Sequence, residues 1–162
     1  MTASIFPLFF MALIGILGSV VCVDLRYRKI TNIQNLLLLA VGLLFGLFVK
    51  NDVASAAMGA IAGGVILFGI RQVHLSLRGQ DGIGFGDIKF MIGAGAWVGW
   101  DGIAPLLLIA SILALLAVGA GTLVTGDTLK IGHKLAFGPF LALALLTVFL
   151  LHEWQVAPWI PS

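Results

Sequence analysis

The chain has 162 residues, of which 60% are hydrophobic and 10% are charged, and its formal net charge is +2. A soluble globular domain carries about 25% charged residues, so the composition excludes that class and predicts one integral membrane domain over residues 1–162. The single cysteine, Cys22, excludes a disulfide within the chain and a CxxC metal site.

Six uncharged, apolar runs follow one another along the chain, separated by short charged or turn-forming segments. A spanning helix needs about 20 mostly apolar residues, so these runs predict an all-α membrane protein, a bundle of six transmembrane helices. The predicted spans are residues 1–23, 30–49, 53–70, 90–100, 102–126 and 135–151. Glycines spaced four apart within the spans, such as Gly59 and Gly63, predict close approach of helix backbones.

The basic residues orient this bundle. Eight of the nine Lys and Arg residues lie in or beside the first, third and fifth connections: Arg26, Arg28, Lys29, Arg71, Arg78, Lys89, Lys130 and Lys134. Cytoplasmic connections are enriched in these residues, so we predict that the three connections face the cytoplasm and that both termini lie on the other side. Span 90–100 is short for the hydrocarbon core, but the same charge pattern favours a crossing over a re-entrant segment.

Two aspartates, Asp24 and Asp87, stand at the edges of apolar segments. An ionisable group there costs several kcal/mol (about 3 on insertion scales) and is a functional-site candidate. The predicted topology puts both at the cytoplasmic face. Two carboxyl groups at short range share a proton, and such a pair can hold and activate a water molecule. The plainer alternatives are a solvated helix-end charge for Asp24, paired with Arg26 or Arg28, and an ordinary helix N-cap for Asp87.

Other candidates surround this pair in the sequence. Gly84 and Gly86 precede Asp87 and, without a Cβ, would let a substrate backbone approach closely. Lys89 either extends to the lipid headgroups or contacts the aspartate pair or a substrate carbonyl. Asp81 and Asp127 are ordinary loop acids, or they attract a basic part of a substrate.

The histidines His74, His133 and His152 do not cluster in the sequence, so we expect no metal site. The chain offers no signal for a cofactor or for nucleic acid binding, and it does not indicate an oligomeric state.

Three motifs resemble the type IV prepilin peptidases, which are aspartic membrane peptidases of the A24 class. Residues 24–32 are similar to the family's aspartate followed by Ile-Pro-Asn. Residues 84–89 (GFGDIK), followed by residues 93–100 (GAGAWVGW), give a long and specific match. Residues 136–142 are similar to the family's Pro-Phe-Gly-Pro segment before the last helix. Thr31 and Ala136 replace prolines of the family pattern, at positions that shape turns.

This resemblance implies that Asp24 and Asp87 are the catalytic pair of an endopeptidase in the bacterial cytoplasmic membrane. Its substrates would be prepilins or pseudopilins, whose basic leader is cut after a glycine at the cytoplasmic membrane edge. Many family members carry paired CxxC motifs associated with N-methylation, which this chain lacks, so we expect the short, peptidase-only form. Two alternatives stay open: a presenilin-type intramembrane protease, which shares Gly-x-Gly-Asp, and a proton-coupled transporter using the same aspartates as relay groups.

Overall fold

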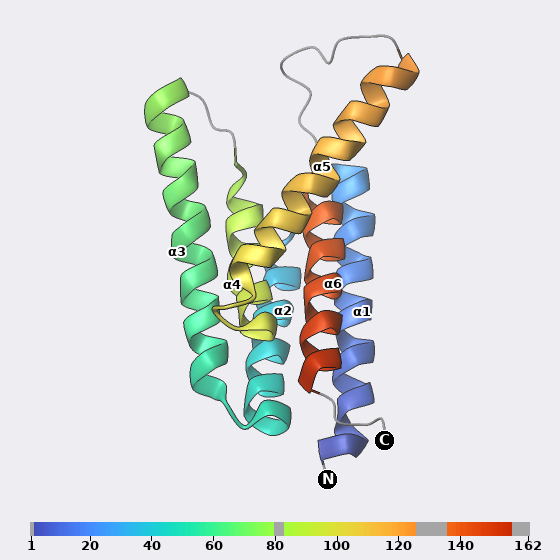
Figure 1. Ribbon diagram of the computed structural model, residues 1–162, viewed down its shortest axis with the longest axis vertical. Helices are drawn as coiled ribbons and strands as arrows, with labels where there is room; N and C mark the ends of the chain where they lie inside the picture. Colours follow the sequence, from blue (N-terminus) through green and yellow to red (C-terminus); the bar gives the residue numbers. More distant parts are fainter. Residues whose placement is uncertain (1, 80–82, 126–135, 157–162) are drawn as a thin grey trace.

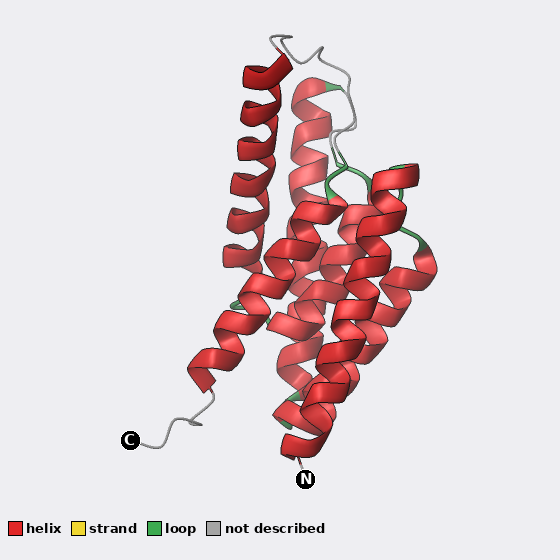
Figure 2. Cartoon of the chain, turned by 90° about the vertical axis from the view of Figure 1, so that its right-hand side faces the viewer, coloured by secondary structure: helices red, strands yellow, loops and turns green. Residues whose placement is uncertain are grey.

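The computed structural model describes residues 2–79, 83–125 and 136–156. In this part of the chain all regular structure is helical (Figure 2). The helices are α1 (Thr2–Tyr27), α2 (Asn32–Phe45) with a π-helical turn η1 (Gly46–Lys50), α3 (Val53–Arg78), α4 (Phe85–Val98), α5 (Ile103–Thr125) and α6 (Gly138–Val156). The all-α prediction and its six helices are therefore confirmed.

Four of these helices are long and apolar enough to cross a membrane, over Ile5–Tyr27, Asn32–Lys50, Val53–Arg78 and Ile103–Gly121. The apolar part of α6, Gly138–Glu153, is shorter. Large apolar side chains cover the outside of the bundle, among them Leu77 and Leu115. An exposed apolar surface of this kind is what lipid contact requires, and the chain is a multi-pass membrane protein.

The helices alternate in direction (Figure 1). α1, α3 and α5 run upward in this view and end at the upper end of the bundle, where α2, α4 and α6 begin. α1 begins and α6 ends at the lower end. The last residues of α1, α3 and α5 and the first residues of α2, α4 and α6 therefore lie at the same end of the bundle, although many of them are far apart in the sequence.

Local sequence signals set the starts of α2 and α3. Thr31 caps α2 in a reciprocal capping box, since its hydroxyl accepts from the Gln34 amide while the Gln34 side chain accepts from the Thr31 amide. Thr31, which stands where the family pattern has proline, is thus a helix cap. Asp52 caps α3 by accepting a 2.9 Å hydrogen bond from the Ser55 amide.

α4 is the central helix, because nine of its 14 residues are buried. α3 packs against it through glycines: a Cβ built on Gly59 would lie 2.2 Å from the Gly95 carbonyl oxygen, and one on Gly63 would lie 2.5 Å from that of Met91. On its other side, the Trp97 indole N–H donates to the Leu38 carbonyl of α2 at 2.9 Å. The close packing predicted from the glycine spacing is confirmed.

Four helices differ from the predicted spans by several residues. α4 begins at Phe85 instead of residue 90, α6 ends at Val156 instead of residue 151, and α1 and α3 run past their predicted ends. α1 continues to Tyr27, so Asp24 lies inside its last turns, and the Arg28 amide still donates to the Asp24 carbonyl at 2.8 Å. α3 continues to Arg78, well past residue 70, and ends where Gly79 adopts a left-handed conformation with φ of 66°. Arg71, predicted in a connection, is therefore a helical residue.

Candidate active site

Asp24 is held against the start of the last helix. It is 5% exposed, and its Oδ2 accepts a 2.9 Å hydrogen bond from the amide of Gly138, the first residue of α6. The first amides of a helix have no partner within it and carry the positive end of the helix dipole. Asp24 supplies that partner from 114 positions away. The alternative reading as a solvated helix-end charge is wrong.

Gly138 is required by this contact. A Cβ at this position would lie 2.7 Å from Oδ2 of Asp24 and 2.9 Å from its carboxyl carbon, far inside ordinary contact distance. The glycine therefore lets the amide reach the carboxylate. The contact therefore explains why a glycine stands at position 138. From the sequence alone, Gly138 was only one residue of the motif at residues 136–142.

Asp87 lies in the first turn of α4, three residues after the N-cap. The cap residue is Gly84, whose carbonyl accepts from the Asp87 amide at 3.2 Å. The Asp87 carboxyl turns back toward Gly84, since a Cβ there would lie 3.3 Å from its Oδ2. The alternative that Asp87 is itself the N-cap is therefore wrong. Asp87 is half-buried, on a helix that is otherwise almost entirely apolar.

The two carboxyl groups lie near the same end of the bundle. Asp24 and Asp87 come from α1 and α4, which are separated along the chain by two complete helices, yet their negative charges are close enough to act on each other. Burial strengthens this interaction, because a low dielectric screens charge weakly. The shared proton and the activated water expected from the sequence stay a prediction for these two groups.

The start of α2 supports the first turn of α4. The Asn35 side-chain amide donates to the Gly86 carbonyl at 3.4 Å, and Lys89 Nζ donates to Asn32 Oδ1 at 2.8 Å. A Cβ on Gly86 would lie 3.4 Å from that of Ile30, in ordinary contact. Residues 24–32 and 84–89, matched as separate motifs, thus meet in one structure.

These contacts show where several of the predicted site residues lie. Lys89, for which lipid contact or contact with the pair was expected, has Asn32 as its hydrogen-bond partner. Gly84 is exposed and open to an approaching chain, while Gly86 faces Ile30. Asp81 and Asp127 lie outside the described residues, and their roles stay predictions. Among the described residues, no three His, Cys, Asp or Glu side chains gather as metal ligands would.

Comparison with known proteins gives one family. Residues 11–119 match the model of the "Type IV leader peptidase family", a range that contains both aspartates and ends before Gly138. A "Leader peptidase HopD" from Escherichia coli is 42% identical over 109 residues, which cover 64% of this chain and 66% of that protein. No solved structure matches the chain significantly.

Longer relatives are similar over the same region. A "Prepilin leader peptidase/N-methyltransferase" from Dickeya chrysanthemi is 35% identical over 133 residues, covering 80% of this chain and 46% of the relative. One of the same description from Burkholderia pseudomallei (strain K96243) is 37% identical over 123 residues, covering 74% of this chain and 38% of the relative. The chain thus spans less than half the length of these two relatives.

Proposed function

Because the chain belongs to the type IV leader peptidase family, we propose that it is a membrane-embedded aspartic endopeptidase that removes the basic leader from type IV prepilins or pseudopilins. The proposal is supported by two acids from distant helices, Asp24 of α1 and Asp87 of α4, whose charges act on each other at the upper end of the bundle. Such a pair supplies the acid and the base of peptide hydrolysis without a covalent intermediate.

The reaction follows from the shared proton. The ionised carboxyl accepts a proton from the water held between the two groups, and the protonated carboxyl donates to the substrate carbonyl oxygen. The Gly138 amide keeps Asp24 oriented during this exchange. A substrate backbone would reach Asp87 past the exposed Gly84, which has no side chain to obstruct it.

The proposal includes an orientation in the bacterial cytoplasmic membrane. The upper end would face the cytoplasm, because Arg26, Arg28, Lys29, Arg78 and Lys89 lie in or beside its connections. Both termini would then face the other side, and all six helices would cross. The short α4, about 21 Å at 1.5 Å per residue, can do so because neighbouring helices shield it from lipid along most of its length.

Recognition of the leader needs acidic groups, because the leader is basic. Arg26, Arg28 and Lys29 have the wrong sign for this task. Asp81 and Asp127 belong to two of the three connections on the proposed cytoplasmic side and have the right sign. We therefore propose them as leader-binding residues, with the exposed Gly84 as the open approach to Asp87.

The proposal is tested with the wild-type protein in proteoliposomes and a purified prepilin with a basic leader before its apolar helix. We expect cleavage at the end of the leader, measured by mass spectrometry of the products. A matched substrate whose glycine before the cleavage site is replaced by leucine should stay intact. Acidification of the liposomes with both substrates intact would instead establish a proton-coupled transporter, and cleavage within the apolar helix would indicate a presenilin-type protease.

A substitution at Gly138 tests the orientation of Asp24. Gly138→Ala is expected to lower kcat/KM by about 100-fold, the effect of a displacement near 1 Å in a catalytic group, because its Cβ cannot occupy the same space as the Asp24 carboxyl. Gly15→Ala, on the α1 helix that carries Asp24 but with open space around it, is the control and should keep wild-type kinetics. Equal activity of both variants would show that the contact with Gly138 does not orient Asp24.

A further inference from the structure

Arg71 is a buried cation on α3, 8% exposed. It lies about 27 Å along the helix from Val53, at 1.5 Å per residue, toward the upper end. A charged side chain inside a membrane protein is costly and is usually paired with other groups. A buried arginine at this position therefore calls for a functional explanation.

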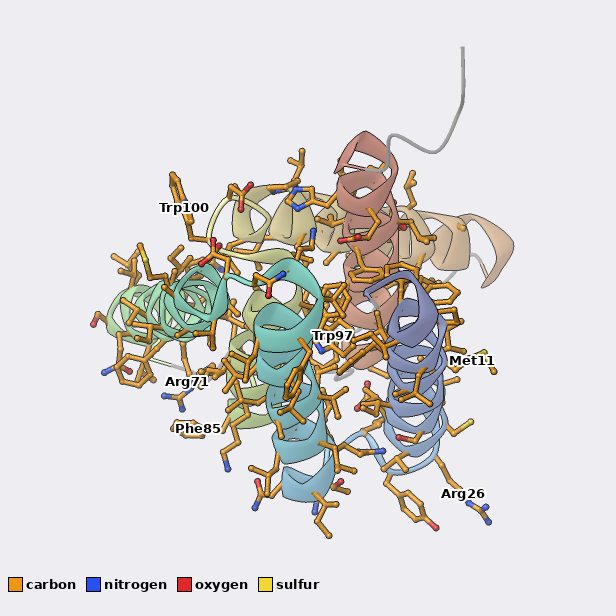
Figure 3. The ribbon with its side chains drawn as sticks, turned by 90° about the horizontal axis from the view of Figure 1, so that it is seen from below. Met11, Arg26, Arg71, Phe85, Trp97 and Trp100 are labelled. Atoms are coloured by element: carbon orange, nitrogen blue, oxygen red, sulfur yellow. The ribbon has the colours of Figure 1, made fainter. Side chains whose placement is uncertain are left out.

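The guanidinium of Arg71 contacts the residues on both sides of Gly84. Its Nε donates to the Ile83 carbonyl at 3.2 Å, and its Cζ lies 4.1 Å from the centre of the Phe85 ring. Figure 3 shows Arg71 and Phe85 lying together at one edge of the bundle. A planar guanidinium suits this double contact, because it can stack on a ring while an N–H in its plane donates to a carbonyl.

The residue between these two contacts determines where Asp87 lies. Gly84 is the N-cap of α4, and its carbonyl accepts from the amides of Asp87 and Ile88 at 3.2 and 3.4 Å. The Asp87 carboxyl also packs against Gly84. Any movement of Ile83 or Phe85 would therefore move the first turn of α4 and the carboxyl that it carries.

We infer that Arg71 is a positioning residue that holds the first turn of α4 and so keeps the Asp87 carboxyl in its place at the upper end of the bundle. Its kinetic consequence rests on the proposed peptidase function, whereas its effect on the first turn of α4 does not. Attraction of the leader is not its role, since leader and guanidinium are both positive, and the charge is buried beneath the Phe85 ring rather than offered to solvent.

The kinetic test compares Arg71→Gln, Arg71→Lys and Phe85→Leu with the wild type in prepilin cleavage. We expect Arg71→Gln to lower kcat by about tenfold or more while KM changes by less than about twofold, because Asp87 is misplaced and the substrate contacts are kept. Arg71→Lys should recover only part of the loss, since it restores the charge but not the planar stack. Arg78→Gln, on the exposed last residue of α3, is the control and should behave as wild type.

Hydrogen–deuterium exchange of the segment 83–90 gives a measurement that needs no activity. Arg71→Gln and Phe85→Leu should each speed exchange of the Asp87 and Ile88 amides by about tenfold, with the rest of α4 unchanged. If exchange in this segment stays at the wild-type rate, or if it rises equally along α3 and α4, the inference is wrong. If Arg71→Gln does not fold, Phe85→Leu, which leaves every charge in place, decides the question.

The two proposals fail separately. A wild-type protein that leaves all prepilins intact contradicts the peptidase function, and the exchange measurement still decides whether Arg71 holds α4. A wild-type protein that cleaves, together with Arg71→Gln and Phe85→Leu variants of unchanged kcat, contradicts the positioning role alone.

Discussion

Replacing Asp24 or Asp87 with asparagine is expected to lower the rate of leader cleavage by about a thousandfold or more, the upper part of the range for loss of a general acid or base. Asparagine has nearly the same shape as aspartate, and its side-chain oxygen can still accept from the Gly138 amide. It cannot exchange a proton at the pH of the reaction. Each variant should therefore fold normally and bind substrate, and the loss should appear in kcat.

Two comparisons make this prediction specific. Asp52→Asn is the matched control, because Asp52 caps α3 at the lower end and asparagine caps equally well, so its cleavage rate should equal that of wild type. The variant with both Asp24→Asn and Asp87→Asn should be no less active than either single variant, since groups that act as a unit are non-additive. Cleavage at the wild-type rate by either single variant would rule out the paired mechanism.

Gly59→Ala is expected to cause the largest loss of stability. The Cβ it adds would lie 2.2 Å from the Gly95 carbonyl oxygen and 2.6 Å from the carbonyl carbon of Gly99. Both are backbone atoms of α4 or its end, so no rotamer change can make room, and α3 must move away from α4. We expect a loss of about 3 kcal/mol, the upper part of the usual range for overpacking, seen as a fall of roughly 6–12 °C in the melting temperature in detergent.

Gly69→Ala makes the same chemical change on the same helix where nothing lies within 4 Å of the new Cβ. Alanine favours a helix over glycine by about 1 kcal/mol, so this variant should melt at or slightly above the wild-type temperature. If both alanines shift the melting temperature equally, the effect comes from helix propensity, and the close contact between α3 and α4 does not limit stability.

The helices and their order could be predicted from the sequence because the signal is strong and local. Long apolar runs without charges have few alternatives in a membrane protein, and each of the six predicted runs overlaps one α-helix in the described part of the chain. The placement of Asp24 and Asp87 at one end of the bundle also followed, since alternating helix directions bring the end of α1 and the start of α4 together there. Neither inference required knowledge of side-chain packing.

The contacts that orient the pair could not be predicted in this way. Gly138 lies 114 residues from Asp24, and nothing in its own neighbourhood indicates a partner. Arg71 was assigned to a connection because a charge usually marks the end of an apolar span, whereas its burial depends on Ile83 and Phe85. Such contacts depend on which faces of distant helices pack together, and the hydropathy pattern of the sequence does not predict these faces.

The hydrogen bond between Asp24 and Gly138 joins the first helix to the last. During synthesis, α1 to α5 are made before Gly138, and chains fold from the N-terminus as they emerge. A nascent chain thus contains both aspartates but lacks the amide that orients one of them. The full set of contacts around Asp24 is therefore a late product of biosynthesis, reached when α6 joins α1.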